Sequence, residues 1–344
     1  MRVVAGMLIA GTVFVCTAGA MWVHSAASPF PDQIQQAAAA PAPQKPLTQK
    51  TDFKTDPKPD PLADVTASIP EPKASASAIK PACSNPNALG IARAVEIDTT
   101  GGPGFGFEHF KQLDFLNDKE VVLTFDDGPW PVNTPAVLKA LADECTTGVF
   151  FAIGKHATYH PEILRQVAAA GHTVGSHTWS HANLNKKSFT EQQGKDEIEK
   201  GFSAVRMALG APPASFFRFP ELQHAPAMVT YLGSRNVAIF SCDIDSFDFR
   251  ARNPEQIVDT VMTKLDKQGK GIILMHDFQK HTAEALPALL GRLKAGGYKV
   301  VQMKAKAPVQ TIAQYDEELL KSAKVPTVST RPVSSVVQTV SVTR

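Results

Sequence analysis

The sequence predicts an α/β domain built around a parallel sheet of about seven strands, and three observations support that prediction. Between residues 118 and 306, short apolar runs alternate regularly with helical patterns, which is the order of elements in a parallel sheet with helical crossovers. The runs are apolar throughout, as a sheet covered on both faces requires. Ionisable residues gather where the runs end. The alternation alone is compatible with an open sheet and with a closed barrel.

Seven of the apolar runs are predicted to be strands. Each is short and lies between segments with a helical pattern or a turn. In chain order they are Val121–Phe125, Gly148–Ile153, Thr173–Ser176, Ser215–Phe219, Val237–Cys242, Gly271–Met275 and Lys299–Gln302.

Six helices are predicted between these strands, and several carry start or stop signals. Asn253 followed by Pro254 predicts an N-cap with proline at the first helical position. Ser188 and Glu191 predict a capping box, and Gly210 stands where a helix C-cap belongs. The helices expected are Thr134–Asp143, Pro161–Ala170, Phe189–Leu209, Ala225–Ser234, Pro254–Lys267 and Thr282–Ala295.

The N-terminal segment carries an export signal. The uncharged run from Val3 to Val23 follows Arg2 and is long enough to cross a bilayer. Small residues follow it, as in a signal peptide. We expect residues 1–27 to be either a cleaved signal peptide or a retained membrane anchor, with membrane contact only through residues 3–23 if they are not cleaved. Both alternatives export the rest of the chain, to the periplasm or the cell exterior.

The remaining chain divides by composition. Residues 29–86 hold 12 of the 26 prolines and few large apolar residues, so this stretch cannot bury a core. The expected layout is an Ala/Pro-rich linker over 28–86, an N-terminal extension packing on the domain over 87–117, the domain itself over 118–306, a C-terminal helix over 307–324 and a disordered tail over 325–344.

Composition narrows the class of protein. Lys and Arg (35) nearly balance Asp and Glu (33), which gives a formal net charge of +2, and no polybasic tract is present. This argues against nucleic acid as a partner. Hydrophobic residues at 43% exclude a wholly disordered chain. We expect a monomer.

Four cysteines are present, one of them, Cys16, in the export segment. No Cys-x-x-Cys pair occurs, which argues against a cysteine zinc site. An exported protein meets oxidising conditions. We therefore expect a Cys83–Cys145 disulfide, and a free Cys242 packed as a small apolar residue.

Ionisable residues end five of the predicted strands, and active sites of parallel α/β folds assemble at that edge. One carboxylate and two imidazoles form a hydrolytic zinc ligand set that leaves coordination positions open. Asp127, His177 and His181 supply that set. We expect one divalent metal, zinc first, with Co²⁺, Ni²⁺ or Mn²⁺ as alternatives.

Four further residues complete a hydrolytic site. Asp126 is assigned as the general base that deprotonates the attacking water. Arg218 can keep that carboxylate ionised and oriented. His276 can protonate a leaving amine, provided that a carboxylate against its other nitrogen keeps it charged. Asp248 is the first choice for that carboxylate and Asp245 the second.

These residues lie in five ordered motifs that resemble those of the polysaccharide deacetylase family, the NodB-homology group of carbohydrate esterase family 4. The resemblance covers roughly residues 118–304 and implies a distorted (β/α) barrel, metal-dependent removal of acetyl groups from N-acetylated sugars, and the roles given above. The motifs are Thr124-Phe125-Asp126-Asp127-Gly128-Pro129, Ser176-His177-Thr178-Trp179-Ser180-His181, Arg218-Phe219-Pro220, Asp245-Ser246-Phe247-Asp248-Phe249 and Leu274-Met275-His276-Asp277.

The chain departs from the family pattern at two positions. Glu221 stands where the third motif usually has a tyrosine whose main-chain amide helps to bind the oxyanion, and a backbone donor survives any side chain. Phe249 replaces the usual tryptophan of the fourth motif. We expect substrate contacts from Pro220, Glu221 and Phe249. Trp130 and Trp179 are candidate sugar-stacking surfaces.

The predicted function is de-N-acetylation of an amino-sugar glycan such as peptidoglycan or a chito-oligosaccharide, with release of acetate. Three alternatives remain open on sequence alone. One is hydrolysis of a non-sugar amide or cyclic imide on the same fold. The others are a catalytically silent glycan-binding module and a glycosidase that uses paired carboxylates.

Overall fold

The computed structural model describes residues 83–111 and 113–323. The predicted export segment, most of the predicted linker and the predicted C-terminal tail lie outside these residues. Within the part of the chain that is described, no helix is both long and apolar enough to cross a membrane.

Ten strands form the sheet, and seven of them coincide with the seven predicted runs. The other three are short or half-exposed. In chain order the strands are β1 (Arg93–Ile97), β2 (Gly104–Phe105), β3 (Glu120–Asp126), β4 (Val149–Ala152), β5 (Thr173–Ser176), β6 (Phe216–Arg218), β7 (Ala238–Phe240), β8 (Ile244–Asp245), β9 (Gly271–His276) and β10 (Lys299–Ala305).

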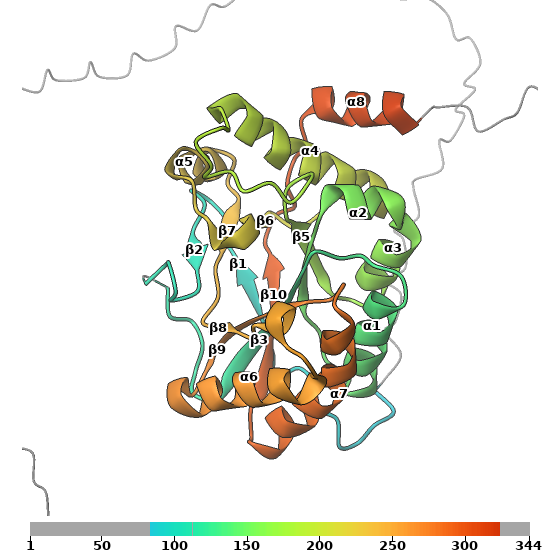
Figure 1. Cartoon of the computed structure of the whole chain (residues 1–344), viewed down its shortest axis with the longest axis vertical. Helices are drawn as coiled ribbons and strands as arrows, with labels where there is room; N and C mark the ends of the chain where they lie inside the picture. Colours follow the sequence, from blue (N-terminus) through green and yellow to red (C-terminus); the bar gives the residue numbers. More distant parts are fainter. Residues whose placement is uncertain (1–82, 112, 324–344) are drawn as a thin grey trace, which may run out of the picture. The chain divides into compact units, whose positions relative to one another are not determined.

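The strands close into a distorted barrel, with helices around it (Figure 1). β3 pairs along its length with β9, and its carboxyl end also pairs with β4. From β4 the strand order continues through β5 and β6 to β7. β8 follows β7 in the chain and pairs with β9, so the chain crosses from one end of this order to the other, although no ladder pairs β7 with β8. Every one of these pairings is parallel. The predicted α/β fold is confirmed, and the structure decides for the barrel.

Two strands of the N-terminal extension belong to the same sheet. β1 pairs with β10, with Arg93 opposite Val301, and β2 pairs with β7. β10 in turn joins the amino end of β3. The segment before the predicted domain therefore contributes backbone hydrogen bonds to the sheet at two places.

In the described residues, eight α-helices connect or flank these strands, and six of them match those predicted between the strands. Asn253 caps its helix as predicted, accepting a hydrogen bond from Gln256 N–H. The predicted capping box is wrong: Thr190 and Gln193 form it, because the helix begins two residues later than expected. The helices are α1 (Asn133–Asp143), α2 (Gly154–Tyr159), α3 (Pro161–Ala169), α4 (Glu191–Leu209), α5 (Pro226–Ser234), α6 (Pro254–Gln268), α7 (Lys280–Ala295) and α8 (Ala313–Ala323).

The residues of β3 alternate between two environments. Val121, Leu123 and Phe125 pack in the cluster that includes α1, α6 and α7. Val122 packs in a second cluster, with Phe151 and other residues of the strands. Because side chains on a strand alternate between its faces, Thr124 and Asp126 share the face of Val122. This places Asp126 inside the barrel.

The predicted cysteine pairing is confirmed. Cys83 and Cys145 form a disulfide, with their Cα atoms 5.8 Å apart. It joins the start of the described chain to the residues just after α1. Cys242 is free and buried, also as predicted.

Candidate active site

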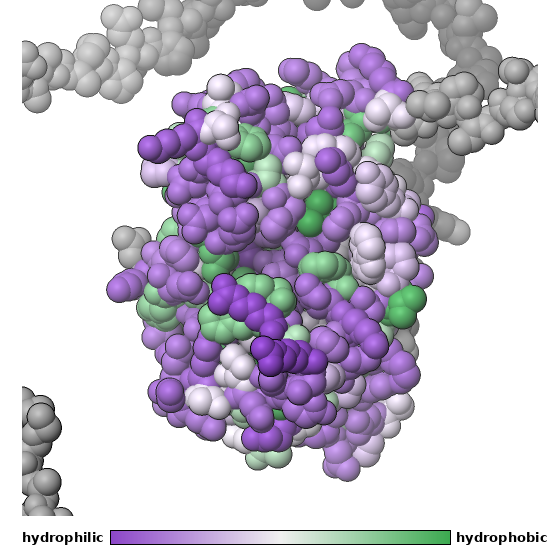
Figure 2. Space-filling view, viewed as in Figure 1, coloured by the Kyte–Doolittle hydropathy of each residue, from purple (hydrophilic) through white to green (hydrophobic). Residues whose placement is uncertain are grey.

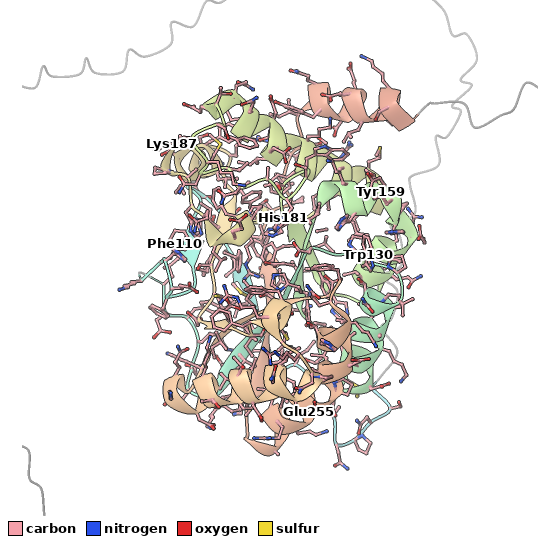
Figure 3. The ribbon with its side chains drawn as sticks, in the orientation of Figure 1. Phe110, Trp130, Tyr159, His181, Lys187 and Glu255 are labelled. Atoms are coloured by element: carbon pink, nitrogen blue, oxygen red, sulfur yellow. A yellow bond between two sulfur atoms is a disulfide. The ribbon has the colours of Figure 1, made fainter. Side chains whose placement is uncertain are left out.

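Ionisable residues at the carboxyl ends of β3, β5 and β9, together with Glu221 after β6, line one cavity of about 600 Å³. In the space-filling view, hydrophobic residues border a hollow near the middle of the face shown (Figure 2). His181, one of the residues that line the cavity, lies near the middle of the same view in Figure 3. The parallel sheet therefore brings together residues as distant in sequence as Asp126 and His276, which lie opposite each other on β3 and β9.

Asp126 and Asp127 reach the same site although they are adjacent. Two successive side chains of an extended strand point to opposite faces. Asp127 leaves the extended conformation, with a φ of 74°, at the turn that continues into Gly128 and Pro129. This left-handed backbone brings the second carboxylate into the cavity that the first already faces.

Asp127, His177 and His181 form a cluster whose three ligand atoms all lie within 4.8 Å of one another. Asp127 Oδ1 is 3.5 Å from His177 Nε2 and 3.3 Å from His181 Nε2, and it is buried without a hydrogen-bond partner. An unsatisfied buried carboxylate oxygen facing two imidazole nitrogens fits a divalent cation.

His177 is held in the tautomer that a metal ligand needs. Its Nδ1 lies 2.7 Å from the carbonyl oxygen of Arg218, so Nδ1 carries the proton and Nε2 offers its lone pair. Burial lowers the pKa of His177. This effect is larger than that of the neighbouring carboxylates of Asp126 and Asp127, which raise the pKa. A neutral imidazole is the form that binds metals.

Arg218 is completely buried and holds Asp126 by a charge-assisted hydrogen bond of 2.8 Å from Nη1 to Oδ1. The same guanidinium donates to Thr124 Oγ1 and to the carbonyl oxygen of Ser241. Its plane lies 4.5 Å from the ring centroid of Phe151. These contacts fix the guanidinium, and the guanidinium fixes the orientation of Asp126.

His276 is paired with Asp248. Its Nδ1 lies 2.6 Å from Asp248 Oδ1, and its backbone N–H donates to Asp248 Oδ2. Burial would lower the pKa of His276, but the Asp248 carboxylate outweighs it and raises the pKa to about 10. Asp245, the second choice, is used elsewhere: its Oδ1 accepts the N–H of Phe247. The structure thus places Asp248 against His276.

Two residues that the sequence analysis did not single out hold the turn of Asp126 and Asp127. Asp277 accepts hydrogen bonds from Gly128 N–H (3.0 Å) and Thr134 Oγ1 (2.5 Å), and its own N–H donates to the carbonyl oxygen of Asp126. Burial raises the pKa of Asp277 to about 7. His156 Nδ1 lies 2.6 Å from the carbonyl oxygen of Asp127.

Two of the five residues expected to contact substrate line the cavity, and three do not. Glu221 and Phe249 line the cavity, and the Phe249 ring lies 5.7 Å from the ring of His276. Trp130 packs edge-on against His156 and lies to the side of His181 in Figure 3. Pro220, Trp130 and Trp179 are not among the lining residues of the cavity.

The cavity also has a wall that the sequence analysis missed. Glu108 and His109, from the segment after β2, line it together with Asp126, Asp127 and His276. No motif marks them, because they precede the strand pattern of the domain. Only the pairing of β2 with β7 brings this segment to the β7–β8 connection, so predicting its place at the cavity would have required predicting that pairing.

Comparison with known proteins places the chain among glycan deacetylases. A family model described as polysaccharide deacetylase matches residues 115–238. The chain is 30% identical over 209 residues to a chitooligosaccharide deacetylase of Sinorhizobium fredii, covering 55% of this chain and 95% of that protein. It is 35% identical over 191 residues to a peptidoglycan-N-acetylmuramic acid deacetylase of Bacillus subtilis, covering 54% of this chain but only 38% of that protein.

A solved structure agrees with these sequence matches. It is a peptidoglycan deacetylase of Bdellovibrio bacteriovorus, similar with a TM-score of 0.56 and 34% identity over 63% of this chain and 59% of that one. The fold and the sequence therefore point to the same family.

Proposed function

Because this chain belongs to the polysaccharide deacetylase family, we propose that it hydrolyses the acetamide of an N-acetylated amino-sugar glycan and releases acetate. The observation that carries the proposal is the convergence of three groups on one cavity: the Asp127–His177–His181 cluster, Asp126 held by Arg218, and His276 held by Asp248.

Asp127, His177 and His181 would hold one divalent metal, zinc in our proposal, because the unsatisfied Asp127 Oδ1 and two imidazole Nε2 atoms are the ligand set that zinc hydrolases use. Bound there, the ion would polarise the substrate carbonyl and the attacking water.

Asp126 is proposed as the general base. Its Oδ1 is held by Arg218, and its Oδ2 lies on the side of His177, 3.9 Å from Nε2. A carboxylate with one oxygen fixed by a buried guanidinium can accept the proton of the attacking water on its other oxygen without turning away from it. Arg218 acts through Asp126 and has no contact of its own with substrate in this proposal.

His276 is proposed as the general acid. A pKa of about 10 keeps the imidazole protonated at neutral pH, so its Nε2 can deliver a proton to the nitrogen of the departing amino sugar. Protonation is needed because an amide nitrogen leaves as an amine. The backbone N–H of Glu221 is the proposed donor to the carbonyl oxygen, as the family pattern implies.

The substrate is proposed to be peptidoglycan or a chito-oligosaccharide, the two classes named in the relatives of this chain. The proposed setting is the periplasm or the cell exterior, with residues 1–27 as export segment and the linker as tether. We also propose that the protein acts as a monomer.

An acetate assay with a substrate panel tests the proposal. The metal-loaded protein is incubated with peptidoglycan, with chito-oligosaccharides and with simple acetamides, and released acetate and glycan products are measured. We expect acetate from a glycan with its chain length unchanged. Activity on acetamides alone would indicate a non-sugar amidase, glycan shortening would indicate a glycosidase, and no product would indicate a binding module.

A further inference from the structure

A second cavity, of about 570 Å³, lies next to the one that holds the catalytic residues. The two cavities share three wall residues, Glu108, Asp245 and Phe247. The proposed reaction uses only the first cavity. The cavities are similar in size and adjoin at these three residues.

Glu108 of the common wall belongs to the segment that follows β2, whereas Asp245 and Phe247 lie in and just after β8. The segment after β2 runs residue by residue along the β7–β8 connection, so closely that a Cβ at Gly106 would lie 2.6 Å from the backbone nitrogen of Cys242. The contacts are Phe107 N–H to Asp243 Oδ1 at 2.5 Å, Glu108 N–H to the Cys242 carbonyl oxygen at 3.1 Å, and His109 Nδ1 to Ser241 Oγ at 2.7 Å. The wall is therefore a fixed part of the fold. Phe110, at its end, lies on the opposite side of His181 from Trp130 (Figure 3).

The second cavity offers the chemistry that binds sugars. Phe107 and Phe247 each leave 39% of their surface exposed, which gives aromatic surface for the apolar face of a sugar ring. Carboxylates of Glu108 and Asp245 lie beside them as acceptors for hydroxyl groups. Lys264 fixes Phe247, because its ammonium lies 4.0 Å from the ring centroid while it donates to the carbonyl oxygen of Asp245.

We propose that the second cavity is a binding subsite for the sugars that adjoin the one being deacetylated, and that Phe107 is its main contact. This rests on the proposed function. Phe107 and Glu108 precede residue 115, where the match to the family begins, so the N-terminal segment of this chain contributes to the subsite.

The test measures dependence on glycan length in the full chain. For the metal-loaded wild type, kcat/KM for acetate release is compared from the dimer to the hexamer of N-acetylglucosamine, and we expect it to rise with length. Phe107→Ala should lower kcat/KM on the long oligomers by about threefold to tenfold, the range that an aromatic contact supplies. It should leave the shortest cleaved oligomer unchanged. Phe107→Tyr should keep the wild-type profile, and Leu320→Ala, at an exposed residue of α8, is the matched control.

A binding measurement separates failure of the subsite from failure of the proposed function. The affinity of the Asp126→Asn protein for the same oligomers is measured with and without Phe107→Ala. If wild type releases no acetate but Phe107→Ala still weakens binding of long oligomers, the subsite stands and the proposed reaction falls. If acetate is released and Phe107→Ala matches wild type at every length, the subsite is refuted.

Discussion

Asp126 and Asp127 are neighbours in the chain with opposite surroundings. A buried guanidinium holds the first, so its negative charge is already compensated. The second has a buried oxygen, Oδ1, that faces the Nε2 atoms of His177 and His181 and makes no hydrogen bond. This difference supports the different roles proposed for the two carboxylates: Asp126 as the group that exchanges a proton, and Asp127 as a metal ligand.

Asp126→Asn should therefore retain the metal and lose turnover. Asparagine keeps the shape of the side chain but cannot accept the proton of the attacking water. We expect kcat to fall by about 10²–10⁴-fold, the usual contribution of general base catalysis. Metal content by elemental analysis, together with acetate release, checks this. Wild-type kcat in a variant with full metal would assign the base to another residue.

The pairing of His276 with Asp248 predicts the alkaline side of the pH profile. Since the acid must be protonated and its pKa is raised to about 10, activity should persist as pH rises and decline near pH 10. In Asp248→Asn, burial becomes the largest influence on the pKa of His276. Because burial lowers this pKa, the decline in activity should move to lower pH.

The measurement is the pH dependence of kcat/KM for wild type and Asp248→Asn. Thr282→Val is the control, because it removes one hydrogen bond to Asp248 and leaves the imidazole–carboxylate pair. An unchanged alkaline limb in Asp248→Asn would contradict the role given to His276.

At the scale of elements, the carboxyl end of β9 serves the site with two successive residues. His276, the last residue of β9, lines the cavity, whereas Asp277, the next residue, bonds to Gly128 in the turn after β3 and to Thr134 in α1. The end of one strand thus supplies the proposed acid and the support of the proposed metal ligand. A Cβ at Gly128 would lie 2.1 Å from the Asp277 carboxylate, so this contact also requires glycine.

Asp277→Asn should loosen this turn. The amide replaces one acceptor oxygen with a donor, so the bonds from Gly128 and Thr134 cannot both persist. We expect metal affinity to fall by about 10–100-fold, as is typical when a residue that orients a ligand is lost. Isothermal titration with Zn²⁺ measures it, and Thr134→Ser, which keeps the hydroxyl, is the control. Unchanged affinity in Asp277→Asn would show that the turn holds its shape alone.

The elements with strong local signals could be predicted from the sequence. The apolar runs of the barrel, such as Thr173–Ser176, and the cap at Asn253 were found correctly. β2 and β8 are two residues long, and no periodicity can be read over such a length. β1 alternates between half-buried and exposed residues, so it lacks the continuous apolar signal of the barrel strands.

The candidate site divides in the same way. The three candidate metal ligands, Asp127, His177 and His181, lie in sequence motifs with a recognisable spacing. All three were named from the sequence, and the structure brings them together. Glu108 and His156 carry no such spacing, and Asp277 lies in a motif but was given no role. They reach the site only through register and crossover geometry, which a single sequence does not encode locally.

At the scale of the whole molecule, the N-terminal extension is fastened to the barrel at three points. The disulfide of Cys83 and Cys145 anchors its start, β1 joins β10, and β2 joins β7. Between β1 and β3 the chain delivers the wall that contains Glu108. Stability and the shape of the substrate site therefore depend on the same segment.

Cys145→Ser should lower the free energy of unfolding. The bridge closes a loop with a sequence separation of 62, for which loop-closure entropy gives roughly 4 kcal/mol before any strain is subtracted. Urea unfolding at neutral pH measures the loss. Reductant should destabilise wild type and leave Cys145→Ser unaffected. Equal unfolding midpoints of oxidised wild type and the variant would contradict a stabilising bridge.

The central claim is that the protein hydrolyses acetamide groups of glycans in this cavity, and that it uses one metal ion held by Asp127, His177 and His181. The most direct test titrates Zn²⁺ into chelator-stripped protein and follows acetate release from a chito-oligosaccharide, beside the His177→Ala and His181→Ala variants. The account predicts that activity rises with zinc and saturates at one equivalent in wild type, while both variants fold but neither bind zinc nor release acetate. Full activity in the stripped protein, or in both variants, would contradict it.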